Sequence, residues 1–269
     1  MIGLGLGIGN RRRRRGPTAL RQFVNSASKG AWFWPGQPGS LWQTETQTTP
    51  VTAVSQSVGR IDGNGASGAV AFSQSSSGLR PVFAAGGLVQ FDGTDDILEG
   101  AGNILTISRA ANAVTFIGRV KFGSLAAAQQ IIALSSNVGA SRRFSFRVLS
   151  TGALQCSLRR LDADSYMSYT TAAGVVAANT AYSIIASVDY VGNTASIYLN
   201  GGPDILAATL TLASPPGPTS NTASVRARLG ASVAASPTDY FAGAIGMFGF
   251  TNTIPTAAER AAIFADLAL

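Results

Sequence analysis

Short runs of alternating apolar and polar residues limit the fold of this chain more than any other feature of the sequence. In the run 113–122, Val114, Phe116, Val120 and Phe122 share one side, and Thr115, Arg119 and Lys121 lie mostly on the other. A period of two is typical of a β-strand with one buried face. Turn signals recur about every 8–12 residues between such runs, as they do in sandwiches and barrels. An all-β body is therefore predicted for residues 31–254.

The charged residues Glu and Lys, which stabilise surface helices as pairs, are scarce. Charged residues make up 12% of the chain, and Glu occurs only at positions 45, 99 and 259 and Lys only at 29 and 121. Numerous surface helices held by Glu–Lys pairs are therefore excluded. One helix is predicted, at about residues 256–268, because Thr256 and Glu259 form a capping box after Pro255, and Ile263, Phe264 and Leu267 follow on one face.

A pair of strands joined by a short turn is predicted within residues 183–199. Apolar residues at 184, 186 and 188 alternate with Ser183, Ser187 and Asp189, and Val191-Gly192-Asn193 then turns the chain back. Asn200-Gly201 is the strongest short-range turn signal in the sequence, because a type I′ turn requires positive φ at both of its central residues.

The chain has one cysteine and no histidine. Because Cys156 is the single cysteine, an internal disulfide is excluded. Its position between Leu154 and Leu158 on one strand face predicts a buried, unreactive thiol. The lack of histidine excludes Ser-His-Asp and Cys-His mechanisms and histidine metal sites.

Residues 1–30 form a basic, Gly-rich segment. Ile2, Leu4, Leu6 and Ile8 alternate with glycine, and Arg11, Arg12, Arg13, Arg14 and Arg15 follow. The segment contains seven basic residues and no acidic one, so the other 13 basic and 13 acidic residues balance. We predict an anchoring arm whose apolar edge adds a strand to a partner's sheet. Three contacts are open for the arginines: an acidic patch on a partner protein, which is favoured, nucleic acid, or solvent.

Several stretches of the sequence, taken together and in this order, resemble the sequence pattern of a known family. They are Trp34-Pro35, Leu41-Trp42-Gln43, residues 48–51, 58–60, 79–81 and 89–98, then 183–189, 195–201, 228–231, 240–250 and 256–267. Together they resemble laminin-G-like, concanavalin A-like domains of structural proteins in tailed bacteriophages, over about residues 31–268. The resemblance implies a concanavalin A-like jelly-roll sandwich of two antiparallel sheets over residues 31–269, between the N-terminal arm and a short C-terminal helix.

Enzymatic activity is not expected. Glycoside hydrolases need two carboxylates about 5–9.5 Å apart, and glucanases of this fold usually carry them as Glu-x-Asp-x-Glu. No such run occurs, and the three Glu residues are isolated. Asp162 and Asp164 have the one same-face spacing in a strand-like stretch, and a solvated surface is the favoured interpretation of that pair.

Two further groups are candidate binding residues. Asp92, Asp95 and Asp96 offer oxygen ligands of the kind Ca²⁺ accepts, although a tight turn capped by Asp92 is favoured. Trp32, Trp34 and Trp42 can stack on a glycan, although aromatic residues early in a sandwich are more often part of its core. No cofactor other than this calcium ion is expected.

The function predicted from the resemblance is that of a non-enzymatic virion protein: a head fibre or decoration protein, a collar or neck appendage, or a tail fibre component. Such a protein is made in the host cytoplasm, occurs as a homo-oligomer or in multiple copies, and contacts capsid, portal, neck or tail proteins. The alternative is a carbohydrate-binding module for host surface glycan. Nucleic acid is not an expected partner. Neither is a membrane, because no run of about 20 continuous apolar residues occurs.

Overall fold

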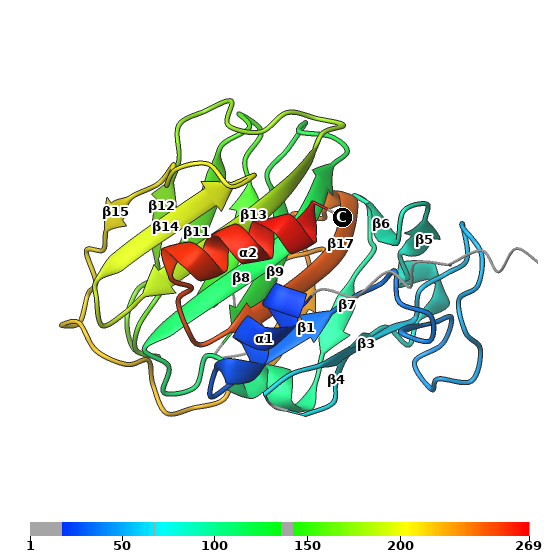
Figure 1. Ribbon diagram of the computed structural model, residues 1–269, viewed down its shortest axis with the longest axis horizontal. Coiled ribbons are helices and arrows are strands. Elements are labelled where there is room, and N and C mark those ends of the chain that lie inside the picture. Colours follow the sequence, from blue (N-terminus) through cyan, green and yellow to red (C-terminus); the bar gives the residue numbers. More distant parts are fainter. Residues whose placement is uncertain (1–17, 67, 136–141, 269) are drawn as a thin grey trace, which may run out of the picture.

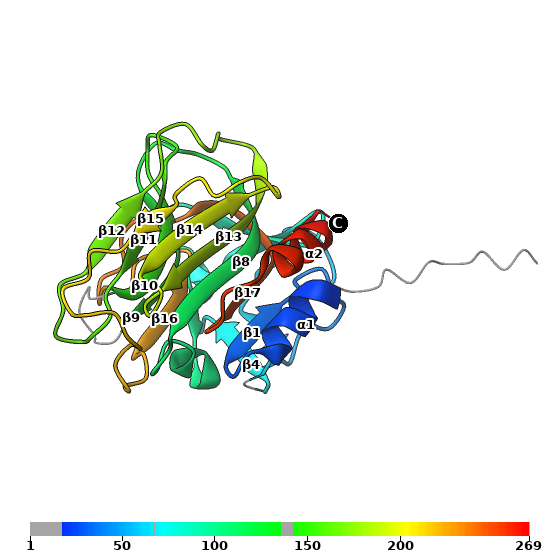
Figure 2. The same ribbon diagram turned by 60° about the vertical axis from the view of Figure 1, so that its left-hand side comes forward.

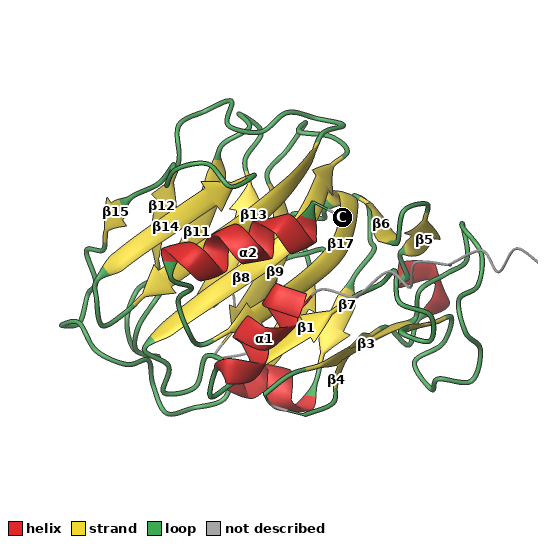
Figure 3. Cartoon of the chain, viewed as in Figure 1, coloured by secondary structure: helices red, strands yellow, loops and turns green. Residues whose placement is uncertain are grey.

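The computed structural model describes residues 18–66, 68–135 and 142–268. The residues predicted to anchor the arm, Ile2, Leu4, Leu6, Ile8 and the five arginines 11–15, lie outside this part of the chain. Figures 1 and 3 show a body made of strands, with two helices on one side.

One layer of the body is an antiparallel sheet that lies beneath the helices, here called the helix-covered sheet. Its strands, in order across the sheet, are β15 (Ala208–Thr209), β14 (Thr194–Leu199), β13 (Ala181–Asp189), β8 (Ala113–Phe122) and β17 (Ala242–Thr251). The far edge of β17 pairs with β6 (Leu88–Asp92) near its start and with β1 (Gly30–Phe33) near its end. β5 (Val82–Ala84) extends the sheet beyond β6.

The other layer, the back sheet, is also antiparallel. It runs through β12 (Met167–Thr170), β11 (Leu154–Leu158), β10 (Arg142–Val148), β9 (Gln129–Ser135), β16 (Arg226–Leu229), β7 (Leu98–Gly100), β4 (Val70–Ser73), β3 (Arg60–Asn64) and β2 (Leu41–Trp42). Because β3 also pairs with β1, the two layers are continuous at that edge. The predicted two-layer antiparallel sandwich is confirmed.

The main core fills the space between the layers. The predicted inward residues of β8, including Val114, Phe116 and Val120, are fully buried in it. Phe33, Phe72, Phe248 and Phe250 form an aromatic cluster, in which the rings of Phe33 and Phe248 stack with centroids 4.6 Å apart. Aromatic pairs of this kind add to the stability that burial alone provides.

The predicted C-terminal helix is confirmed as α2 (Ala257–Leu267). Thr256 and Glu259 form the complete capping box, in which the Thr256 Oγ1 accepts from the Glu259 amide and the Glu259 carboxylate accepts from the Thr256 amide. α2 lies across the outer face of β13 and β8 (Figure 1). Ile263, Phe264 and Leu267 are its buried residues.

A second helix, α1 (Thr18–Ser26), corrects the sequence prediction of one helix. Residues 18–30 had been grouped with the extended arm, but α1 places Leu20, Phe23 and Val24 on one buried stripe. Its first amides are capped from a distance, because Asp266 Oδ2 accepts from the amides of Ala19 and Leu20 at 2.6 and 2.9 Å. A cap supplied by α2 leaves no local signature of the kind that marks most helix starts.

The two helices cover the outer face of the helix-covered sheet (Figure 2). Their buried residues form a second apolar cluster with Trp32, Ile117 and Ile185, which point outward from β1, β8 and β13. Two short 3₁₀ helices, η1 (Ser77–Leu79) and η2 (Gly102–Thr106), also occur, and none of the helices in the described part of the chain could cross a membrane. Because α1 and α2 occupy the middle of this face, any ligand site on it must lie beside them.

Candidate functional site

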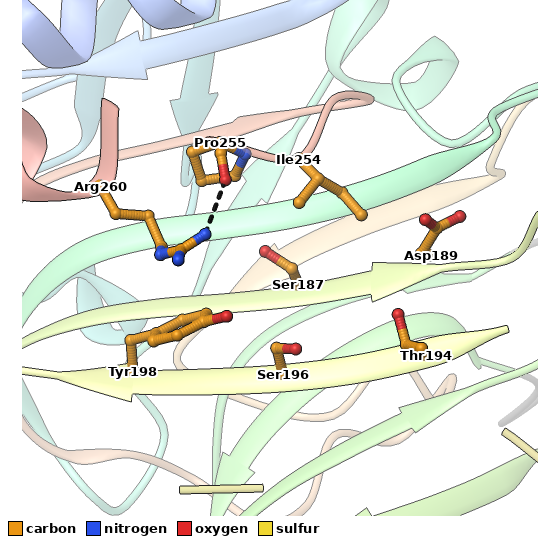
Figure 4. Close-up of a pocket in the computed structure, with 8 residues that line it drawn as sticks. All are labelled: Ser187, Asp189, Thr194, Ser196, Tyr198, Ile254, Pro255 and Arg260. Carbon is orange, nitrogen blue, oxygen red and sulfur yellow. Dashed lines mark hydrogen bonds between the residues drawn. The ribbon is translucent and has the colours of Figure 1, made fainter. Parts of the chain in front are cut away.

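The β13–β14 hairpin presents a row of polar side chains on its outer face (Figure 4). Ser187 pairs with Ser196 across the two strands, and Asp189 pairs with Thr194. Strand alternation sends these side chains outward while Ala186, Val188 and Ile197 enter the core. The hairpin and the Asn200-Gly201 turn that follows β14 agree with the sequence prediction, and the positive φ of both turn residues is confirmed at 50° and 79°.

α2 and the segment before it form one wall of a small hollow above this row. The hollow has a volume of about 40 Å³ and is lined by Ser187, Asp189, Thr194, Ser196 and Tyr198, with Ile254, Pro255 and Arg260 on the other side. The guanidinium of Arg260 lies 4.3 Å from the centre of the Tyr198 ring. Arg260 Nη1 also donates to the Pro255 carbonyl at 2.9 Å. The capping box sets where α2 begins, and it thereby places Arg260 over β14.

Several of these side chains are held in place by the backbone. Asp189 Oδ1 accepts from the amides of Val191 and Gly192 at 3.0 and 2.6 Å, so the carboxylate is fixed by the turn that it caps. The Ser187 hydroxyl lies 3.0 Å from Thr115 Oγ1, which donates to the Thr253 carbonyl. Among the described residues, the Thr194 hydroxyl and the Tyr198 phenol form no hydrogen bond, so both remain available to a ligand.

Asp204 supports the same hairpin from below. Burial opposes the charged form of this carboxyl, but hydrogen bonds from Ser196 and from the amides of Ala207, Ile197 and Leu206 outweigh that cost and lower its pKa. Three of these bonds are 3.0 Å amide contacts to a single carboxylate oxygen. Asp204 therefore orders the chain after β14.

The hollow provides binding groups without an acid–base pair. Its lining contains one carboxylate, one guanidinium and the hydroxyls of Ser187, Thr194, Ser196 and Tyr198. Hydrolysis of a glycosidic bond requires two carboxylates on either side of the bond. Mixed hydrogen-bond donors and acceptors are instead suited to the hydroxyl groups of a saccharide.

The predicted acidic group at residues 92–96 does come together. One ligand atom from each of Asp92, Asp95 and Asp96 lies within 4.8 Å of the others. Asp92 Oδ1 accepts from the amide of Thr94 at 2.7 Å, which is the predicted self-capped turn. Asp96 Oδ2 accepts from the Asp92 amide at 2.8 Å, and its side chain is buried.

The three carboxylates supply part of what calcium requires. Ca²⁺ takes about 6–8 oxygen ligands, so carbonyl groups or water would have to complete the shell. Two of the carboxylates already serve as acceptors for loop amides. The calcium site stays a prediction, in which these residues would hold the ion and stabilise the loop.

Asp96 is expected to make stability fall as the pH rises from about 4 to 6. Burial, followed by the nearby Asp92 and Asp95 charges, raises the pKa of Asp96 from 3.8 to about 6, against the opposing hydrogen bond from the Asp92 amide. Between these values the folded state binds more protons than the unfolded state, so unfolding becomes easier with rising pH. Asp96→Asn should therefore stabilise the protein at pH 7 by up to about 3 kcal/mol.

The measurement is urea denaturation of wild type and Asp96→Asn at pH 4, 5, 6 and 7 in buffer containing a calcium chelator. The difference between the two proteins should grow through this range, while Glu45→Gln, which changes an exposed carboxyl, should show no such trend. A constant difference across the range would show that Asp96 titrates normally.

The tryptophans predicted as stacking residues lie in two places. Trp32 is 9% exposed and packs in the cluster beneath the helices, which leaves no open ring face, and Trp34 packs against the same cluster. Trp42 lies apart on β2, where its Nε1 donates to Asp62 Oδ2 at 2.6 Å. The structure therefore brings Trp32 and Trp34 together but not Trp42.

The carboxylates considered for catalysis are engaged elsewhere. Asp162 is not a freely solvated side chain, because its Oδ1 accepts from the buried Arg143 at 2.5 Å. Asp164 accepts from the Leu161 amide and the Ser214 hydroxyl. Glu99 forms an ion pair with Arg228. Cys156 is buried as predicted, and that burial raises the pKa of its thiol to about 12.

The polar hollow has no local signature in the sequence. Its strand residues were visible as the polar half of the alternation, which was used only to place the strands. Arg260 lies 62 positions after Tyr198 in the sequence, within the predicted C-terminal helix. The sequence does contain one relevant signal, which is the presence of apolar residues at outward strand positions. Ile117 and Ile185 stand at such positions, and both are fully buried. Such residues indicate that something covers the sheet face.

Comparisons with known proteins identify the fold family. Residues 92–259, more than half of the chain, match the laminin-G-type model of the concanavalin A-like lectin/glucanases superfamily. A search of curated proteins found no match. Nothing in these results links the chain to phage proteins, so the virion role, its partners and its location stay predictions.

Solved structures with the same fold have low sequence identity to this chain. The CBM40 of Ruminococcus gnavus IT-sialidase bound to α2,3-sialyllactose has a TM-score of 0.51 and 17% identity, with 66% of this chain and 95% of that chain covered. The NanB sialidase from Streptococcus pneumoniae has a TM-score of 0.51 and 16% identity, with 63% and 26% covered. This chain thus spans about a quarter of the sialidase. With its sandwich topology and the family match together, the chain belongs to the concanavalin A-like lectin/glucanases superfamily.

Proposed function

We propose that this protein is a non-catalytic glycan-binding module, and that it binds a saccharide in the hollow between the β13–β14 hairpin and α2. The observation that carries this proposal is the convergence of a carboxylate, a guanidinium and four hydroxyls in one hollow beside α2. The fold alone does not select a ligand. The chemistry of the hollow does.

Hydrogen bonds to hydroxyl groups are the expected mode of recognition. Asp189 is held by two backbone amides, so it can accept from a sugar hydroxyl without first being ordered. Thr194 and Tyr198 can each donate or accept. Groups held in position before binding lose less entropy when the ligand arrives, which favours affinity.

Ring stacking contributes little at this site. Arg260 already covers the Tyr198 ring at 4.3 Å, so a sugar cannot use that face. The volume of about 40 Å³ holds roughly three water-sized groups. The hollow therefore accepts the hydroxyl edge of one sugar residue, with the rest of the glycan lying outside.

The test is a glycan array with the full chain, followed by calorimetry on the glycans that bind. Asp189→Asn keeps an oxygen acceptor for the turn amides but removes the charge, and Thr194→Val removes one hydroxyl at nearly constant shape. Each is expected to weaken binding about tenfold, because a group on the sugar loses its hydrogen-bond partner. Neither variant should lower the melting temperature by more than a few degrees.

Asp239→Ala is the matched control, because this aspartate pairs with Arg142 and Arg147 of the back sheet, away from the hollow. Its affinity for the glycan should equal that of wild type. The proposal fails if the array shows no bound saccharide, or if both hollow variants bind as tightly as the wild type.

A further inference from the structure

A second hollow lies on the other side of α2, on the same face of the helix-covered sheet. Its volume is about 290 Å³. The smallest ordinary ligand pockets have a volume of about 300 Å³, so this hollow is close to that size. β8 and β13 supply Arg119, Tyr182 and Ser183, the turn after β14 supplies Asn200, and α2 supplies Phe264 and Leu267. Figure 1 shows α2 lying across these strands, so it separates this hollow from the one at Asp189.

Arg119 is the unusual residue of this second hollow. It is half-buried, yet among the described residues its guanidinium forms no hydrogen bond or ion pair. Every other buried or half-buried arginine in that part of the chain has a protein acceptor, namely Arg60, Arg80, Arg142, Arg143, Arg147, Arg159, Arg160, Arg226, Arg228 and Arg260. A partly desolvated cation without a counter-charge favours an anion from outside the chain.

The fold holds the Arg119 stem in place. β8 pairs with β13 so that Arg119 faces Ser183, and both side chains point to the outer face. Gly246 on β17 lies beside the stem: a Cβ at that position would stand in ordinary van der Waals contact with Arg119 Cβ and Cδ, at 3.5 and 3.7 Å, and closest to Leu88 Cδ2, at 3.0 Å.

The other polar groups of the hollow are mainly donors. Asn200 Oδ1 accepts from the Ser183 amide at 2.8 Å, so the NH₂ group of Asn200 is the part left for a ligand. The Ser183 hydroxyl forms no hydrogen bond within the described residues. Lys121 lies two residues beyond Arg119 on the same face and is exposed. No carboxylate is among the described residues that line the hollow.

The end of α2 opposes an anion only weakly. Its last carbonyls carry a partial negative charge of roughly half an electron. Arg119 and Lys121 together carry two full positive charges, whereas the Asp266 carboxylate in the same turn of α2 is engaged by the Ala19 and Leu20 amides of α1. The carbonyls instead offer acceptors for hydroxyl groups, and the nearly buried side chains of Phe264 and Leu267 close this side of the hollow.

We propose that this second hollow binds a carboxylate-bearing saccharide, with the carboxylate paired to Arg119. The proposal rests on the glycan-binding function proposed above and adds a class of ligand to it. A guanidinium and a carboxylate form two parallel charge-assisted hydrogen bonds, which gives direction as well as strength. A neutral saccharide lacks that contact and is expected to bind only at the Asp189 hollow.

The experiment is calorimetry on the full chain with four probes. Two are acidic, namely 3′-sialyllactose and a hyaluronan tetrasaccharide, and they distinguish sialic acid from uronic acid as the source of the carboxylate. Two are matched neutral probes, namely lactose and the tetrasaccharide with its carboxyl groups reduced to alcohols. Wild type should bind at least one acidic probe about tenfold more tightly than its neutral match, and rising salt should reduce that preference.

Arg119→Gln should abolish the acidic preference, and Arg119→Lys should retain part of it. Arg21→Gln, which removes the same charge from the exposed face of α1, is the control and should bind like wild type. Asp189→Asn should weaken the neutral probes and leave the acidic preference intact. Melting temperatures of all variants confirm that each one folds.

The outcomes separate the two proposals. The second site alone is overturned if the neutral probes bind in an Asp189-dependent way and the acidic probes bind no more tightly than their neutral matches. It is also overturned if the acidic probes bind more tightly but keep that advantage in Arg119→Gln. Failure of all four probes to bind, together with an empty glycan array, overturns both proposals.

Discussion

Arg143→Ala is expected to lower the free energy of unfolding by about 3–5 kcal/mol, because it breaks a buried charged network. The Arg143 side chain is fully buried. Nη1 donates to the Thr222 carbonyl at 2.5 Å, and Nη2 donates to Asp162 Oδ1 and to Thr222 Oγ1 at 2.5 and 2.7 Å. Alanine would remove these three hydrogen bonds and open a cavity as large as the lost side chain.

Urea denaturation at pH 7 measures this loss. Arg143→Lys keeps the charge but cannot reach both partners, so it should lose less than alanine does. Arg109→Ala is the control: its Nε donates to Asn221 Oδ1 at an exposed position, and its loss should stay below about 1 kcal/mol. Equal losses at positions 143 and 109 would show that the buried network contributes nothing beyond an ordinary surface contact.

Phe248→Ala should lower the free energy of unfolding by a similar amount, about 3–5 kcal/mol. The side chain is fully buried, and its ring stacks on Phe33 at 4.6 Å. The rings of Phe72 and Phe250 stand 6.1 and 5.9 Å away. The cluster joins β1, β4 and β17 across the two layers, so a cavity here cannot close without moving strands.

Calorimetric or urea unfolding of Phe248→Ala and Phe248→Leu provides the measurement. Leucine fills most of the space and should lose roughly 1–2 kcal/mol. Val191→Ala, at a side chain that is 49% exposed, should change stability by less than about 0.5 kcal/mol. A loss at Phe248→Ala no greater than at Val191→Ala would mean that the aromatic cluster is not part of the cooperative core.

Two hollows on one face give the proposed function a simple physical basis. Each hollow is bounded by outward residues of β13 and by α2, and each has a different charge pattern: a balanced Asp189–Arg260 set in one and unpaired Arg119 in the other. In the proposed function, a saccharide with a carboxylate binds at the Arg119 hollow, whereas a neutral saccharide binds at the Asp189 hollow. The predicted virion role depends on residues 1–15, which lie outside the described part of the chain.

Patterns that depend on neighbouring residues were readable from the sequence. Alternation located β8 at 113–122 with its inward side correct, because side chains on a strand change face at every residue. The capping box located α2, because Thr256 and Glu259 satisfy each other's amides within one turn. Asn200-Gly201 located a turn through the backbone angles that it permits. Each of these signals is complete within about ten residues.

Features built from distant segments were decided only by the tertiary structure. α1 is capped by Asp266, 247 residues away from Ala19, so no local pattern separates this helix from the predicted arm. Asp162 was taken for a surface carboxylate because Arg143, which it neutralises, gives no sign in the sequence of being buried. The polar residues of β13 and β14 become a hollow only because α2 packs over Ile117 and Ile185 and brings Arg260 onto Tyr198. Alternation shows which side of a strand is apolar, but packing determines what covers that side.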